Sequence, residues 1–309
     1  MSTNSDSLHK GKKLSSIECP SNLGLARSSY AREPAVRRLP EWLKKWGIHA
    51  AIHPDKTLRV ETPEYETILD PVTNVLNADK IISYAIKQSE VMANEIDSES
   101  FQLILGGDCS LLIVSAISFK KKGSFGLFYL DGHTDYSTPA QSQSHAAAGM
   151  DLAIVCGIGH PKLTNIFNLR PYIEEKNVFC VCNREHDIED EKLITNSQIH
   201  YVPLGRLRKT GIRQTIVQFI EMIETNKLDG FYIHFDVDVL NDNIMPAVDS
   251  RQADGLSFRE LQQLLLPLLT SPKMYGMQIT ILDPDPDPGA QYTKAFISNI
   301  SPLILKVKQ

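Results

Sequence analysis

Short hydrophobic runs alternate with stretches in which apolar residues recur at a helical period, most regularly from residue 101 onward. The continuous runs predict buried strands, and the periodic stretches predict helices. The predicted strands are 101–105, 125–130, 177–182, 200–202, 231–235 and 275–282, and the predicted helices are 40–46, 71–94, 111–117, 211–225 and 257–269. Strands that are hydrophobic throughout and alternate with helices are typical of a parallel sheet covered on both faces. We therefore expect an α/β fold.

The chain has 309 residues, enough for one large domain or two average ones. No internal repeat, low-complexity tract or linker marks a second domain, so residues 20–309 are predicted to form a single domain. Residues 1–19 begin with a segment rich in Ser, Asn and Lys that has no apolar run. This segment predicts a short disordered tail and lacks the hydrophobic region of a secretory signal.

Composition narrows the classes of partner. The chain has 32 Lys and Arg and 37 Asp and Glu, so it is slightly acidic. This balance argues against a nucleic-acid binder, which needs clustered positive charge. No segment reaches the roughly 18 consecutive apolar residues of a membrane-spanning helix. The five cysteines are odd in number and widely spaced, unlike a disulfide scaffold, which indicates a reducing compartment. We expect a cytoplasmic protein that binds neither nucleic acid nor membrane.

Polar residues directly follow three of the predicted strands, where ligands of parallel sheets collect. These segments are Gly106-Gly107-Asp108-Cys109-Ser110, Asp131-Gly132-His133-Thr134-Asp135 and Asp236-Val237-Asp238. Alternate residues of an extended chain share a face, so the acidic and histidine side chains of each segment point the same way. Crowded carboxylates must protonate, pair with cations or bind metal. A lone Asp-x-Asp is often only a loop cap, but these segments together favour a centre for Mn²⁺ or a similar divalent ion, with room for two ions.

The three segments, together with Ser137-Thr138-Pro139, resemble the signature segments of the ureohydrolases: arginase, agmatinase, formimidoylglutamase and guanidinobutyrase. Their order and spacing agree from residue 22 to the carboxyl terminus. The resemblance implies a three-layer α/β/α fold with a central parallel sheet, in which residues 20–309 form one arginase-like catalytic domain. It also implies two divalent metal ions, with Mn²⁺ favoured, that activate a shared water for attack on an amidine or guanidine carbon.

By match to the family's motifs, one metal ion is held by Cys109, Asp131, Asp135 and Asp236, and the other by Asp131, His133, Asp236 and Asp238. Asp135 is also expected to accept a proton from the attacking water. His145 resembles a loop histidine that transfers protons and meets the substrate in arginases, although an exposed loop histidine is the alternative. Asp187 resembles an aspartate that contacts the amino end of the substrate.

One departure from the family concerns the metal. Most members have histidine where this chain has Cys109, and a softer thiolate shifts preference toward Zn²⁺, Fe²⁺ or Ni²⁺. His234 faces the same side as Asp236 and Asp238 by strand alternation. We hypothesise that His234 lies in or beside the metal shell and offsets the missing histidine; the alternative is a core histidine bonded to the backbone.

A second departure concerns the substrate. Arginases and agmatinases carry a glutamate that grips the guanidinium in a late strand, and this chain has Ile281 at that position. Asp283, Asp285 and Asp287 follow and either supply a carboxylate or form an exposed acidic loop. The missing glutamate therefore favours a small formimino compound or another substituted amidine over arginine as the substrate. Other guanidino compounds stay open as alternatives.

Two other functions stay open. A non-catalytic or regulatory arginase-fold protein with weakened metal binding is favoured by Cys109 and Ile281 and opposed by the intact acidic motifs. An acyl or arylamide deacetylase shares the fold broadly, but those enzymes place histidine pairs near the metal, and none is found here. The resemblance further implies a homo-oligomer, a trimer or a hexamer.

Overall fold

The computed structural model describes residues 11–27, 32–184 and 188–309. Eight parallel strands form one sheet in the order β2-β1-β3-β8-β7-β4-β5-β6. The strands are β1 Lys13–Glu18, β2 Lys56–Arg59, β3 Ser100–Leu105, β4 Phe125–Leu130, β5 Val178–Val181, β6 His200–Val202, β7 Gly230–Asp236 and β8 Met274–Thr280. The six strands expected from the hydrophobic runs are all present, and the central parallel sheet is confirmed.

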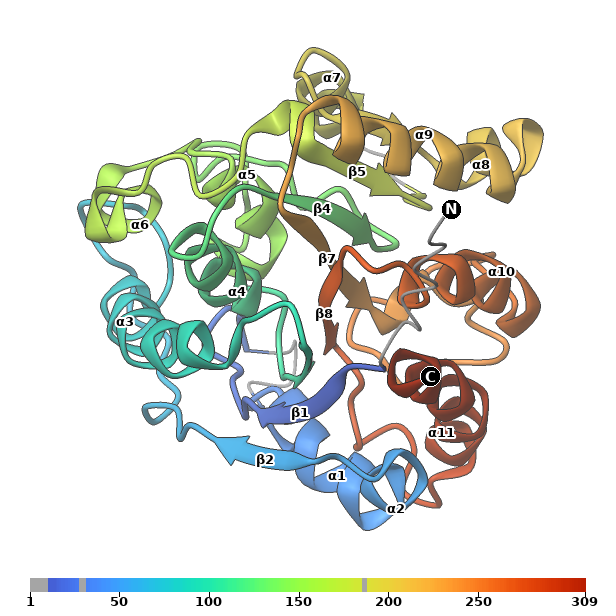
Figure 1. Ribbon diagram of the computed structural model, residues 1–309. Coiled ribbons are helices and arrows are strands. Elements are labelled where there is room, and N and C mark those ends of the chain that lie inside the picture. The colour runs from blue at the N-terminus through green and yellow to red at the C-terminus, as the bar shows by residue number, and fades with distance from the viewer. Residues whose placement is uncertain (1–10, 28–31, 185–187) are drawn as a thin grey trace.

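Helices cover both faces of the sheet (Figure 1), which confirms the three-layer α/β/α architecture. One face carries α3 Ala78–Glu95, α4 Leu111–Lys120 and α5 Asp151–Val155, and the other carries α9 Ile212–Thr225, α10 Phe258–Leu269 and α11 Gln291–Ile304. The shorter helices are α1 Leu39–Lys45, α2 Ile48–Ile52, α6 Pro161–Thr164, α7 Ile188–Thr195 and α8 Leu204–Thr210. Within the described residues, no helix has the length and apolar character to cross a membrane.

Strand β1 corrects the predicted disordered tail, because Lys13–Glu18 pairs with both β2 and β3. The strand was missed because its buried positions include polar residues. Ser16 bonds His49 at 3.1 Å, and Glu18 lies near Lys44 and Arg59, each at 3.3 Å. Satisfied polar groups can be buried at little cost, and they hide the strand from a hydrophobicity pattern.

Helix α3 begins at Ala78, so the helix predicted from residue 71 starts too early. The Asp70 carboxylate accepts hydrogen bonds from the backbone N–H groups of Val72 and Thr73, which closes a turn. Asn77 is left-handed at φ 55° and therefore lies outside the helix. Local side-chain bonding of this kind competes with helix formation despite the apolar periodicity.

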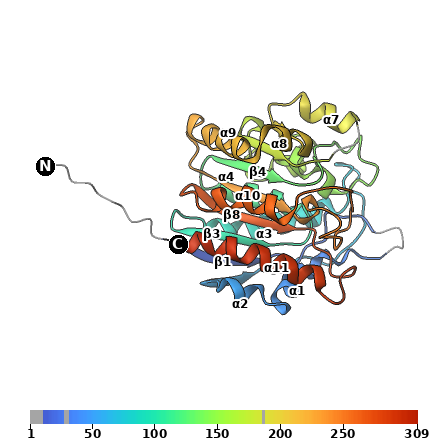
Figure 2. The same ribbon diagram turned by 90° about the vertical axis from the view of Figure 1, so that its right-hand side faces the viewer.

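The core lies in two hydrophobic layers, one on each face of the sheet. On one face, the Phe219 ring of α9 meets Phe128, Phe179 and Phe231 edge-on at centroid distances of 5.1, 5.3 and 5.0 Å. On the other face, Phe119 stacks on Tyr232 at 4.3 Å. Because all strand pairs are parallel, the carboxyl ends of the strands lie at a single edge of the sheet (Figure 2). Residues distant in sequence meet at this edge.

Candidate metal centre

The centre is built from the residues that follow β3, β4 and β7 at the carboxyl edge of the sheet. Asp131 ends the run of β4, and its Oδ1 accepts a hydrogen bond of 2.7 Å from the His133 N–H. Asp236 ends β7 and in the same way accepts 2.8 Å from the Asp238 N–H, which starts the short 3₁₀ turn Val237–Val239. Each aspartate thereby folds the chain back so that the next polar side chain also faces the edge.

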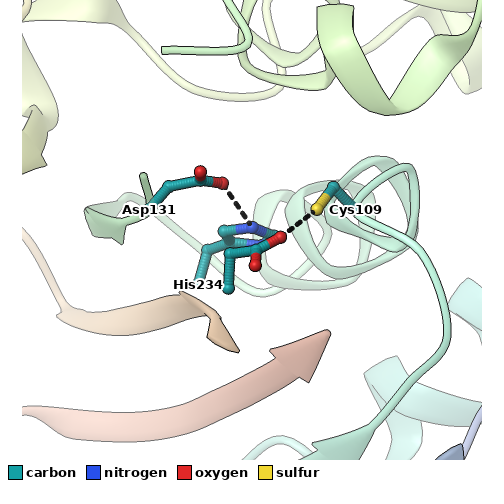
Figure 3. A group of neighbouring side chains, drawn as sticks. Cys109, Asp131 and His234 are labelled. Carbon is teal, nitrogen blue, oxygen red and sulfur yellow. Dashed lines mark hydrogen bonds and ion pairs between the residues drawn. The ribbon is translucent and has the colours of Figure 1, made fainter. Parts of the chain in front are cut away.

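A first cluster consists of Cys109, Asp131, His234 and Asp236, whose ligand atoms all lie within 4.8 Å of one another. All four side chains are buried. The Cys109 thiol donates to Asp236 Oδ2 at 2.7 Å, and His234 Nε2 lies 3.6 Å from Asp131 Oδ2. Figure 3 shows the sulfur, the imidazole and the Asp131 carboxylate directed toward one another.

Two atoms of this cluster are buried without a hydrogen-bond partner: Asp131 Oδ2 and His234 Nε2. A buried polar atom left unpaired costs on the order of 1–3 kcal/mol. A divalent cation between them satisfies both at once, so the residues present fit a metal ion.

A second cluster consists of Asp131, His133 and Asp238. His133 Nδ1 lies 2.9 Å from Asp238 Oδ2 and 3.7 Å from Asp131 Oδ1, while its Nε2 meets the Ser250 hydroxyl at 3.2 Å. Asp131 belongs to both clusters and offers a different oxygen to each. A carboxylate shared in this way can bridge two ions.

The charges of the centre are unbalanced. Burial raises the pKa of Asp236, and the nearby Asp238 raises it further. Burial together with the Asp236 charge raises the pKa of the Cys109 thiol. Burial lowers the pKa of His133, but Asp238 and Asp131 outweigh it, so this pKa is raised. Without a metal ion, the acidic groups of the site outnumber the positive charges near them, so some of these groups keep their protons. A bound cation would displace those protons.

Asp135 lies apart from both clusters. Its Oδ2 accepts a hydrogen bond of 2.8 Å from Tyr129 Oη, which also lies 3.1 Å from Asp151 Oδ1. Burial and the charge of Asp131 raise the pKa of Asp135. The structure places Asp135 on the wall of the cavity in front of the metal centre, and it does not bring this carboxylate together with the other predicted ligands.

The cavity has a volume of about 530 Å³, a size suited to a small molecule. Cys109, His133, Asp135, Asp236 and Asp238 line its floor or wall. A larger apolar groove lies between α8, α9 and α10, and none of the residues of the two clusters lines it.

Two further carboxylates, those of Asp249 and Asp283, line the cavity wall. Asp283 is one of the three acidic residues that the sequence offered; Asp285 instead bonds Arg38, and Asp287 accepts from Thr293 at the start of α11. Asp249 keeps an exposed surface, although the protein atoms around its carboxylate and the neighbouring Asp238 raise its pKa to about 7, and Asp283 adds to this effect. The sequence analysis missed Asp249, whose only signal was its place in the loop after Pro246.

Three other residues singled out in the sequence are His145, Ile281 and Asp187. The His145 ring meets the Asn74 carbonyl oxygen through Nδ1 at 3.1 Å, and His145 is not among the residues that line the cavity, although Ser144 and Ala146 are. Ile281 does line it, is buried, and has a left-handed backbone at φ 71°. Asp187 lies outside the described residues.

Arg184 is a further buried residue that the sequence did not assign to the centre. Its guanidinium donates to the carbonyl oxygens of Asp238 at 2.7 Å and Val239 at 3.2 Å. The Arg184 N–H donates to the Gly132 carbonyl oxygen at 2.7 Å. Arg184 therefore connects the turn that carries Asp238 to the turn that carries His133.

The fold and the site together define an α/β protein with a carboxylate-rich cluster of candidate metal ligands at the carboxyl edge of a parallel sheet. Comparison with known proteins agrees. An arginase of Staphylococcus aureus (strain MRSA252) is 28% identical over 229 residues, which cover 74% of this chain and 75% of the relative. An arginase of Bacillus subtilis (strain 168) is 28% identical over 253 residues, which cover 81% of this chain and 83% of the relative.

Solved structures share the fold. The arginase from Bacillus caldovelox matches with a TM-score of 0.83 at 22% identity and covers 96% of this chain and 98% of its own. The formimidoylglutamase from Bacillus subtilis subsp. subtilis str. 168 matches with a TM-score of 0.69 at 16% identity, covering 96% and 87%. The model of the Arginase family matches residues 34–303, so the chain belongs to the arginase family. Membership supports a metal-dependent hydrolase of the ureohydrolase type.

Proposed function

We propose that the protein hydrolyses a C–N bond of a small linear amidine or guanidine with the help of two divalent metal ions. The observation that carries this proposal is the pair of ligand clusters that share Asp131 and open onto one cavity. Asp131 and Asp236 would contribute to both ions, Cys109 to the first, and His133 and Asp238 to the second; Asp135, which the family pattern adds to the first set, belongs to neither cluster. Two such ions, when bound, lower the pKa of a water so that hydroxide is available near neutral pH.

Asp135 is the residue we propose as proton acceptor. It lies on the cavity wall, and its Oδ2 accepts from Tyr129 Oη at 2.8 Å, so we assign proton acceptance to its Oδ1. Burial, together with the charge of Asp131, raises its pKa, so Asp135 takes up a proton more readily than a solvated aspartate does. His145 stays a prediction for proton transfer, and a movement of its loop would be needed to turn the ring toward the cavity.

Asp249 and Asp283 are the residues we propose to bind the cationic amidinium group. Both line the cavity beside the centre, where a carboxylate can accept charge-assisted hydrogen bonds from an amidinium. They stand on loops, whereas the family's glutamate comes from the position that Ile281 occupies here. The amidinium group would therefore be bound by these two loop carboxylates and not by a glutamate at position 281. This difference favours a formimino or other substituted amidine over arginine.

The test is an assay of urea or ammonia release from a panel of guanidino and formimino compounds, each with added Mn²⁺, Zn²⁺, Ni²⁺ and Fe²⁺. We expect turnover of at least one compound, a KM raised about tenfold or more by Asp249→Asn, and no change in Asp285→Asn, a matched acidic residue that bonds Arg38. Absence of turnover with every metal would refute the proposal.

A non-catalytic role is the second candidate, and two observations favour it. Asp135 belongs to neither ligand cluster, and His145 does not line the cavity. The same assay separates the two functions, because a non-catalytic protein would bind compounds of the panel, as measured by calorimetry, without releasing urea or ammonia.

A further inference from the structure

We propose that the first metal position has been rebuilt as a thiolate–imidazole site for Zn²⁺, in which Cys109, His234, Asp131 and Asp236 are the ligands and Asp135 is not. The proposal goes beyond the hydrolase function, because it concerns the ligand set and the class of metal, whichever compound the cavity accepts. His234 thereby becomes a ligand in its own right and not merely a neighbour of the metal.

The four donor atoms lie within 4.8 Å of one another, close to the separations that a tetrahedral zinc site needs. Zinc bonds of about 2.0–2.3 Å at tetrahedral angles place neighbouring donor atoms roughly 3.3–3.7 Å apart. His234 Nε2 and Asp131 Oδ2 are already 3.6 Å apart, and Cys109 Sγ is 2.7 Å from Asp236 Oδ2, where the thiol proton now lies between them. Loss of that proton to solvent would let sulfur and oxygen separate by under 1 Å and bind the ion.

His234 is held in the orientation that ligation requires. Its ring stacks on Tyr129 at 4.5 Å with an interplanar angle of 5°, its Nδ1 lies 3.1 Å from Gln278 Nε2, and the Ser115 hydroxyl donates to Gln278 Oε1 at 2.6 Å. The two ends of a Gln amide exchange by a 180° turn, and the Ser115 hydroxyl can donate or accept. With the amide oxygen toward the ring, Nδ1–H donates to Gln278, and Nε2 keeps a lone pair aimed at Asp131. A hydrogen bond on the far nitrogen is the usual support of a metal-binding histidine.

Asp135 is committed elsewhere. Tyr129 Oη bonds it, the same hydroxyl bonds Asp151, and Asp135 is not among the residues whose ligand atoms gather within 4.8 Å of one another. Tyr129 therefore has two roles: its ring face orients His234, and its hydroxyl retains Asp135.

A metal-free hydrogen-bonded core is the competing explanation, and the unpaired atoms oppose it. His234 Nε2 and Asp131 Oδ2 are fully buried, face each other, and make no hydrogen bond. At 3.6 Å the two atoms share only a long contact, and a metal ion between them would give each a full partner, since a poorly paired buried polar atom is costly. A soft thiolate beside an imidazole and two carboxylates selects Zn²⁺ over Mn²⁺.

The test uses Co²⁺ as a spectroscopic substitute for Zn²⁺ in the full chain after treatment with a chelator. We expect one bound equivalent to give the near-ultraviolet sulfur-to-cobalt charge-transfer band and the intense visible bands of a tetrahedral ion. Cys109→Ser should abolish the charge-transfer band, His234→Ala should weaken Co²⁺ binding at least tenfold and reduce the visible bands, and Asp135→Asn should leave both spectra unchanged. Cys182→Ser, a buried cysteine outside both clusters, is the matched control and should keep the band.

Three results would overturn the proposal: no charge-transfer band in the natural protein, a band that persists in Cys109→Ser, or unchanged spectra in His234→Ala. If Cys109→Ser does not fold, Cys109→His replaces it and should bind Co²⁺ without the sulfur band; a sulfur band in this variant contradicts the ligand set. Because these readouts are spectra and stoichiometries, they hold or fail independently of turnover of any amidine.

Discussion

Replacing Arg184 by Met should destabilise the fold and loosen the metal centre together. The side chain is 8% exposed, and its guanidinium donates to the carbonyl oxygens of Asp238 and Val239. A hydrogen bond from a charged donor contributes about 1.5–3 kcal/mol. The 2.7 Å bond falls in the upper part of that range and the 3.2 Å bond at its lower end. Since neighbouring bonds are not additive, we expect a loss of about 3 kcal/mol in unfolding free energy.

Arg184→Lys should lose about half as much, because a single ammonium keeps the charge but cannot reach both carbonyls in the geometry of the planar guanidinium. Arg251→Met is the matched control. Arg251 also makes two short hydrogen bonds, 2.6 and 2.7 Å to Asp242, but its side chain is 57% exposed. Exposed pairs contribute at most about 1 kcal/mol.

Urea unfolding followed by circular dichroism measures the stability difference, and a chelator competition with Mn²⁺ measures the dissociation constant. Arg184→Met should weaken metal binding about tenfold, the range found for residues that orient ligands. If Arg184→Met stays within about 0.5 kcal/mol of the natural protein, or if metal affinity does not change, then Arg184 does not hold the Asp238 turn and the reasoning fails.

Three further predictions concern the core, a helix start and the cavity. Phe219→Ala removes a fully buried ring with three edge-on partners and should cost about 3–5 kcal/mol in urea unfolding; Phe219→Leu should cost clearly less, and equal losses would contradict the packing argument. Ser257→Ala breaks the capping box with Glu260 at the start of α10 and should cost about 1 kcal/mol, while Ser257→Thr keeps the cap; a smaller loss in Ala than in Thr would refute the cap. The pKa of Asp249 is raised to about 7, so its carboxylate is protonated below that pH and charged above it. Calorimetry should therefore show that guanidinium binds the metal-free protein more tightly as the pH rises through 7. Asp249→Asn should remove this rise in affinity. A pH-independent affinity in the natural protein would contradict the assignment.

Much of the fold could be predicted because the central strands are buried on both faces. β3, β4 and β7 are buried along their whole length, and such runs are visible in sequence. β1 escaped because its polar residues find partners in α1, α2 and β2, which lie well beyond it in the chain. The start of α3 was predicted too early because the apolar period continues through residues that instead form a local turn at Asp70.

The acidic motifs of the centre could be predicted because Asp131 and Asp236 stand where buried strands end, although a turn closed by Asp236, and not strand alternation, directs Asp238 to the same edge. The partners of these residues could not. Whether His145 or Asp135 reaches the cluster depends on the contacts of Asn74 and Tyr129, and those contacts follow from how loops pack. Asp249 also lines the cavity because of how its loop packs, and no pattern in the nearby sequence predicts this position.

The order of strands also has a consequence for how the chain folds. β3 pairs with β8, where Gln102 lies opposite Gly276, so more than half of the chain separates two neighbours at the middle of the sheet. β7 then fits between β8 and β4. The loop that closes when β3 meets β8 is long, and contacts of this kind slow folding. The ligands of the first cluster come from β3, β4 and β7, so none of them can assemble from a local hairpin or helix pair. Capture of an ion there should be a late event that reports a nearly complete sheet, and tight binding would then slow unfolding of the whole domain more than it speeds refolding.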